Sequence, residues 1–197
     1  MDTSEYKINS SFTYLIILAI LILLGIVGRL LPHPPNFTPI AAIALFSGFI
    51  FMKRYMAILA VVVTMLITDY FAFGFLSPEW FASKSMWVVY LSLLFPIVFK
   101  NFLQKKLGFL RITVAALSSS TVFFLATNFA VWAFSPMYEK TWPGLVLCYT
   151  MAIPFFQNTV AGDLIWSGVI FGIYYALRSH SNLTFLKQKS SLIYSSG

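Results

Sequence analysis

The chain has 197 residues, of which 59% are hydrophobic and only 10% are charged. A soluble domain carries roughly 25% charged residues, so this composition cannot cover a water-facing surface and indicates an all-α integral membrane protein in contact with lipid. The net charge of +7 would suggest a nucleic-acid partner in a soluble protein. Here the basic residues are confined to particular loops, which favours a membrane topology and no nucleic-acid partner.

Six apolar segments predict a single domain of six transmembrane helices. In chain order they are 12–31, 39–52, 55–73, 86–103, 111–134 and 158–177. Segment 39–52 is short, so it must tilt, thin the bilayer or lean on its neighbours. The stretch 144–157 contains Pro154 and ends in Gln157, just before Asn158, which predicts a separate re-entrant or interfacial helix before the last span.

The distribution of Lys and Arg predicts the orientation of these spans. With six spans and an inner N-terminus, the outer side holds only Arg29, Lys84 and Lys140. The inner loops then hold Lys7, Lys53, Arg54, Lys100, Lys105, Lys106, Arg111, Arg178, Lys187 and Lys189. Because cytoplasmic loops carry the excess of positive charge, we expect both termini to be cytoplasmic.

Strongly polar side chains are rare in this chain and gather in the predicted outer half. A carboxylate inside a span is costly in lipid, so such residues usually face a cavity or a partner. Several segments would send polar groups to one depth, as in a small-molecule pocket. The candidate substrate-binding residues are Arg29, His33, Asn36, Asp69, Asn128, Trp132, Tyr138, Trp142, Asn158 and Asp163. Arg29 would supply a counter-charge, the Asp and Asn residues hydrogen bonds, and the aromatic residues stacking walls.

Each of these residues also has a structural interpretation. Arg29 could reach the outer headgroups, or it could form an ion pair with Asp69 or Asp163. The Asn residues could form interhelical hydrogen bonds, and the Trp and Tyr residues could belong to an interfacial aromatic belt. The proline-rich loop 31–40 predicts a stiff wall or lid, or a plain connection, with Thr38 capping the helix that follows.

The motifs that the sequence lacks restrict the enzyme classes. It contains no GxxxxGK[ST] phosphate loop, no HExxH, no GxSxG and no CxxC, and its single cysteine, Cys148, excludes a cysteine-cluster metal site. We therefore expect no cofactor and no metal. An enzyme would have to use Asp69 and Asp163 as paired carboxylates, and a third alternative is a structural subunit without a ligand.

Several motifs together resemble those of a known family. They lie at 29–42 (RLLPHPPNFTPIAA), 128–132, 137–138, 141–144, 153–159 and 162–163. The sequence resembles an uncharacterised family of small bacterial membrane proteins regarded as candidate transport proteins. That family is similar to the substrate-binding S components of energy-coupling-factor vitamin transporters, and the resemblance covers nearly the whole chain.

This resemblance implies a multi-pass protein of the bacterial inner membrane that captures a small vitamin-like substrate from the outside. It also implies a partnership with an energy-coupling membrane protein and its ATPases, although some relatives act alone. Cobalamin is one candidate substrate, because solitary relatives import it with the help of a cysteine. Cys148 cannot be matched to that role from the sequence.

Overall fold

The computed structural model describes the backbone of residues 3–73 and 82–194, and the side chains of residues 12–72 and 82–179. Within these ranges the chain forms helices and no strand, which confirms the all-α class. The elements are α1 (Thr3–Leu30), α2 (Ile40–Ile50), α3 (Arg54–Phe73), α5 (Lys84–Leu94), the 3₁₀-helix η1 (Phe95–Phe99), α6 (Lys100–Lys105), α7 (Phe109–Phe134) and α8 (Trp142–Tyr194).

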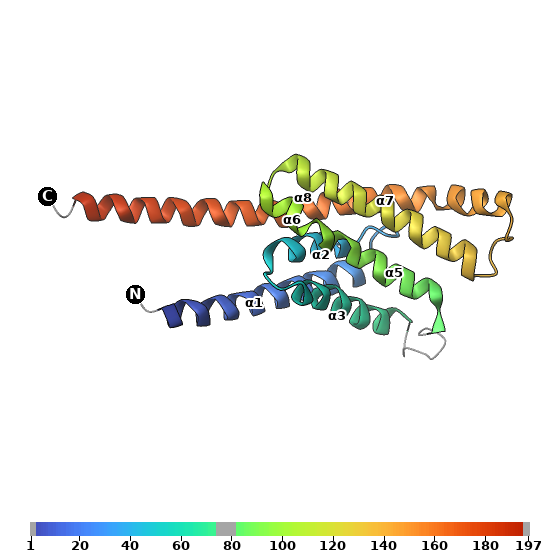
Figure 1. The fold of residues 1–197 in the computed structure, drawn as a ribbon, viewed down its shortest axis with the longest axis horizontal. Coiled ribbons are helices and arrows are strands. Elements are labelled where there is room, and N and C mark those ends of the chain that lie inside the picture. The colour runs from blue at the N-terminus through green and yellow to red at the C-terminus, as the bar shows by residue number, and fades with distance from the viewer. Residues whose placement is uncertain (1–2, 74–81, 195–197) are drawn as a thin grey trace.

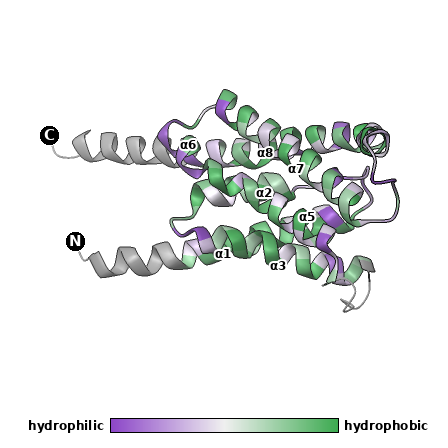
Figure 2. Ribbon diagram, turned by 45° about the vertical axis from the view of Figure 1, so that its right-hand side comes forward, coloured by the Kyte–Doolittle hydropathy of each residue, from purple (hydrophilic) through white to green (hydrophobic). Residues whose placement is uncertain are grey.

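Five helical segments in the described part of the chain are long and apolar enough to cross a membrane. They are Phe12–Leu30, Arg54–Ala72, Lys84–Lys105, Phe109–Phe134 and Trp142–Ser179. The middle of the bundle is apolar, and hydrophilic segments lie toward its two ends (Figure 2). This pattern is that of a multi-pass membrane protein.

The helices form one elongated bundle with α2 at its centre. In Figure 1, α1 and α3 lie along one side of α2, whereas α7 and α8 lie along the other, with α5 between them. The described beginning of α1 and the described end of α8 lie at the same end of the bundle (Figure 1).

Helix α2 covers residues 40–50 of the predicted short span 39–52. Its 11 residues extend about 16 Å, roughly half of the 30 Å hydrocarbon thickness. Residues 42–48 are all buried, so neighbouring helices surround α2 on every face. Its last carbonyl groups are satisfied by α6, since Lys100 Nζ donates to the Phe51 carbonyl at 2.9 Å and Gln104 Nε2 to the Phe49 carbonyl at 2.8 Å. The burial of α2 fits the alternative in which this short segment leans on its neighbours.

The start of α2 and the segment 86–103 also differ from the expectation. Helix α2 begins at Ile40, with Pro39 in the capping position and no side-chain cap hydrogen bond, so Thr38 does not cap it. The predicted span 86–103 contains the 3₁₀-helix η1, and Pro96 is the second of its five residues. Proline removes one backbone donor, and the tighter 3₁₀ turn accommodates that loss between α5 and α6.

The predicted break between 144–157 and 158–177 is wrong. Helix α8 runs without interruption from Trp142 to Tyr194 and contains Pro154 in its interior. In Figure 2 its first turns are seen almost end-on, whereas the following part lies across the view, so the helix bends. An internal proline is the usual cause of such a bend. It removes one hydrogen bond and turns the axis, but the neighbouring helices hold both parts in helical conformation.

Glycines in α1 and α8 allow neighbouring segments to approach these helices closely. A Cβ added at Gly25 would lie 2.6 Å from Thr64 Cγ2, and one added at Gly28 would lie 2.7 Å from Pro39 Cγ. A Cβ added at Gly162 would lie 3.1 Å from Phe37 Cα. These contacts place the end of α1 against α3 and seat the loop directly on α8. Gly168 and Gly172, further along α8, have no atom within 4 Å of such a Cβ.

Gly162→Val is expected to lower the thermal unfolding temperature in detergent, because the added atoms collide with the loop backbone at Phe37 and overpacking costs about 1–3 kcal/mol. Gly168→Val is the matched control on the same helix, where the added Cβ meets no atom within 4 Å. Equal losses in the two variants would show that valine in the helix, and not the loop contact, causes the effect.

Candidate functional site

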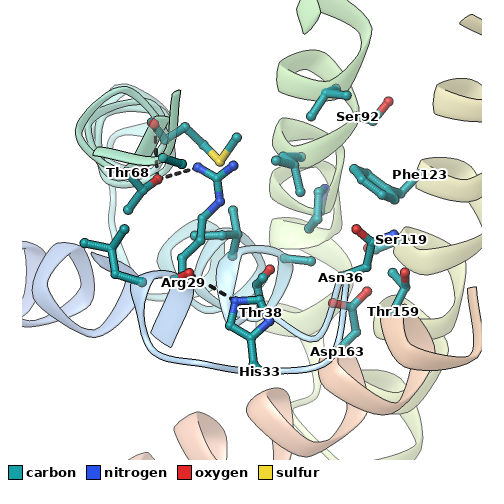
Figure 3. A pocket seen from close by; sticks show the side chains of 18 residues that line it. Arg29, His33, Asn36, Thr38, Thr68, Ser92, Ser119, Phe123, Thr159 and Asp163 are labelled. Atoms are coloured by element: carbon teal, nitrogen blue, oxygen red, sulfur yellow. Dashed lines mark hydrogen bonds between the residues drawn. The ribbon is translucent and has the colours of Figure 1, made fainter. Parts of the chain in front are cut away.

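A cavity of about 310 Å³ lies at the N-terminal end of α2, where Ile40 and Ala41 form part of its lining. The ends of α1 and of the loop 31–39, together with α3, α5, α7 and α8, supply the other walls (Figure 3). Its volume is at the lower end of the range for small-molecule sites. Its polar lining residues are Arg29, His33, Asn36, Thr38, Thr68, Ser92, Ser119, Thr159 and Asp163.

One wall of the cavity is built on a buried ion pair. Arg29 Nη1 lies 2.5 Å from Asp69 Oδ1, with the Asp69 side chain 1% exposed and the Arg29 side chain 22% exposed. The same guanidinium donates to Thr68 Oγ1, and the Tyr90 hydroxyl donates to Asp69 Oδ2 at 2.8 Å. The network joins α1, α3 and α5. Because Asp69 balances the charge of Arg29, this wall is polar but close to neutral.

The opposite wall carries a second buried carboxylate. Asp163 on α8 is 4% exposed and accepts a hydrogen bond of 2.6 Å from Ser120 Oγ on α7. Figure 3 shows Asp163 on the same side of the cavity as Ser119 and Thr159, away from Arg29 and Thr68. Among the described side chains, Asp163 forms no ion pair.

The loop 31–39 closes the cavity between these walls. The ring nitrogens of His33 lie 2.8 Å from the Pro34 carbonyl oxygen and 3.1 Å from the Arg29 carbonyl oxygen, so the imidazole braces the loop on the end of α1. Asn36 has φ 65°, a left-handed conformation that Asn adopts more readily than most residues. The backbone N–H groups of Phe37 and Thr38 bond to carbonyls within the loop.

The structure thus brings four predicted residues, Arg29, His33, Asn36 and Asp163, to one cavity, with Asp69 directly behind Arg29. Asn128 lies outside it, in a smaller adjoining hollow of about 90 Å³ that Asn36 also lines. Its amide donates to the Phe124 carbonyl at 2.8 Å. Asn158 is half-buried and is not among the residues that line the main cavity.

The three aromatic residues predicted as stacking walls do not line this cavity either. Trp132 Nε1 donates to the Glu139 carbonyl at 2.9 Å, and Lys140 Nζ donates to the Tyr138 carbonyl at 3.2 Å, so these contacts brace the turn between α7 and α8. Trp142 is 75% exposed beside an apolar surface hollow. Their positions fit the alternative of an interfacial aromatic belt.

Hydroxyl groups are the part of the site that the sequence analysis missed. Thr68, Ser92, Ser119 and Thr159 all line the cavity. The run of four hydroxyl residues at 118–121 inside a span was a usable signal, because α7 has to bury some of them. Single Ser and Thr residues carry little signal, since in membrane helices they commonly bond to the carbonyl one turn earlier, as Thr68 Oγ1 does to the Thr64 carbonyl at 2.8 Å.

The arrangement of the two aspartates does not favour an acid–base dyad. Two carboxylates that share a proton must lie against each other. Asp69 bonds to Arg29 and Tyr90, whereas Asp163 bonds to Ser120, and the two side chains come from α3 and α8. Among the described residues, no group of three His, Cys, Asp or Glu side chains could hold a metal ion.

Asp69→Asn is expected to destabilise the protein by about 2–3 kcal/mol, below the range for fully buried pairs because Arg29 is partly exposed. Removing the carboxylate leaves the guanidinium without its counter-charge. The double variant Arg29→Gln, Asp69→Asn should lose less than the sum of the single variants, as measured by a double-mutant cycle of unfolding free energies in detergent. Additive losses would contradict a coupled pair.

Comparison with known proteins identifies the family of the chain. The family described as "Family of unknown function (DUF6580)" matches residues 9–186. No curated protein matches the sequence. Since the match extends over nearly the whole chain, including every residue that lines the cavity, the protein belongs to DUF6580, a family of unknown function.

Proposed function

We propose that this protein captures a small polar molecule within the membrane, in the cavity beyond α2, as the substrate-binding subunit of an uptake system. The observation that supports the proposal best is the cavity itself, about 310 Å³ in volume and lined by polar side chains from separate helices. Polar groups in a membrane bundle that face a hollow usually mark a substrate path. A purely structural role would be served better by apolar packing.

The direction of capture follows from the position of the cavity. Arg29 lies in the last turn of α1, so the cavity occupies the half of the bundle away from the described beginning of α1 (Figure 1). The positive-inside rule assigns the basic end of the bundle, which carries Lys53, Arg54, Lys100 and Lys105, to the cytoplasm. On that basis the cavity faces the outer side of a bacterial inner membrane.

The size of the cavity favours a compact ligand. A site of about 310 Å³ suits a small metabolite, whereas a corrinoid macrocycle is several times larger, so cobalamin is not carried into the proposal. The resemblance to S components supplies the remaining part of the hypothesis, in which an energy-coupling membrane protein with ATPases drives release to the inside. Capture does not depend on that partner.

Ala41→Leu tests the proposal, because the longer side chain fills the cavity that Ala41 lines. We expect a small molecule to co-purify with the unaltered protein, as detected by mass spectrometry of solvent extracts, and to be strongly depleted in this variant. Ala19→Leu, at an exposed position on α1, is the matched control and should retain the molecule. Unfolding temperatures check that both variants fold.

Two outcomes would count against the proposal. If nothing is enriched relative to an unrelated membrane protein purified in the same way, the capture function fails. If a compound is captured but its uptake into cells does not depend on the protein, capture stands and the transport role fails.

A further inference from the structure

Asp163 is the cavity group whose charge the described chain leaves unbalanced. It is 4% exposed, it lines the cavity, and it accepts a hydrogen bond from the neutral hydroxyl of Ser120. A carboxylate in so apolar a surrounding is costly unless a cation or several donors accompany it. When Asp163 is ionised, its charge therefore calls for a partner that the neighbouring side chains do not supply.

The other charged or titratable lining groups do not fill this role. Arg29 is paired with Asp69 at 2.5 Å and lies on the opposite side of the cavity from Asp163 (Figure 3). His33 directs its two ring nitrogens at main-chain carbonyl oxygens. Arg29 and His33 therefore both make structural contacts at the cavity wall, and neither pairs with Asp163.

The N-terminus of α2 offsets part of the negative charge but not all of it. Its first residues line the cavity, and a helix N-terminus carries the equivalent of about half a positive elementary charge. The Arg29–Asp69 pair contributes no net charge. An ionised Asp163 would therefore leave about half a unit or more of negative charge at this wall.

We infer that the cavity accepts a small organic amine, whose ammonium group binds the Asp163 carboxylate, so that the ligand is a cation and not an anion. This inference rests on the proposed capture function and specifies its substrate class. It replaces the expectation that Arg29 provides a counter-charge for the substrate, because Asp69 already occupies the guanidinium.

The remaining lining fits this class of ligand. An ammonium group has three donors, and the hydroxyl oxygens of Ser119 and Thr159 line the same side of the cavity as Asp163. At the other side, Thr68 provides a neutral polar group for a hydroxyl at the far end of the ligand. A bare metal ion would need several oxygen ligands at short distance and would leave most of the 310 Å³ empty.

A series of three molecules of equal length tests the charge preference: 4-aminobutan-1-ol, butane-1,4-diol and 4-hydroxybutanoate. Thermal unfolding of the full chain in lipid nanodiscs is measured against the concentration of each. We expect the amine to raise the unfolding temperature at a concentration at least about tenfold lower than the diol, and the carboxylate to have no effect. The series is run first on the unaltered chain, so it does not depend on the folding of a variant.

The variant Asp163→Asn should then abolish the advantage of the amine over the diol. Glu139→Gln, which removes an exposed carboxylate outside the cavity lining, is the matched control and should preserve it. An amine effect that persists in Asp163→Asn would overturn the assignment, as would full competition by NaCl or KCl, which would point to an inorganic cation.

The failure of this inference can be distinguished from the failure of the proposed function. Stronger stabilisation by the diol or the carboxylate overturns the cation class but leaves capture intact. If none of the three molecules stabilises the unaltered chain at millimolar concentration, the amine class is overturned. The identity of any co-purifying molecule then decides the capture function separately.

Discussion

The shortness of α2 is the constraint on which the rest of the structure depends. An apolar helix of about 16 Å, placed among helices that are long enough to cross the membrane, fills only about half of the depth of the bundle. The volume beyond its first turn has to be occupied by something else. The loop 31–39 takes part of it by resting on Gly162, and the cavity is what remains. The cavity therefore exists mainly because α2 is short, and the identity of any single side chain is secondary.

Polar contacts hold the two sides of this hollow, and they differ in electrostatic character. On one side, Arg29, Asp69 and Tyr90 tie α1, α3 and α5 together and cancel each other's charge. On the other side, Ser120 and Asp163 tie α7 to α8 by a single hydrogen bond. In an apolar interior both contacts are strong. The Arg29–Asp69–Tyr90 network stabilises the bundle by itself. The Ser120–Asp163 hydrogen bond leaves the carboxyl group of Asp163 able to accept a further hydrogen bond from a ligand.

The sequence was sufficient for the long helices and for the charged half of the site. Apolar runs of about 20 residues have few alternatives in a membrane protein, and carboxylates inside them are rare enough to be noticed. It was insufficient where packing decides. Pro154 can end a helix or only bend it, and the outcome depends on neighbours that hold both sides of α8. The hydroxyl lining was missed because Ser119, like many membrane serines, bonds to the carbonyl one turn earlier, here that of Ala115. The roles of Trp132 and Tyr138 depend on the short turn between α7 and α8, which their spacing alone does not reveal.

The contact between Cys148 and Asn128 gives this chain a built-in reporter. The Cys148 thiol is 2% exposed and lies 3.4 Å from the Asn128 carbonyl oxygen of α7, and it is the only cysteine in the sequence. A maleimide can reach it only when the early part of α8 moves away from α7. The rate at which maleimide labels the natural thiol therefore reports how often these two helices separate. No engineered cysteine is needed for the measurement.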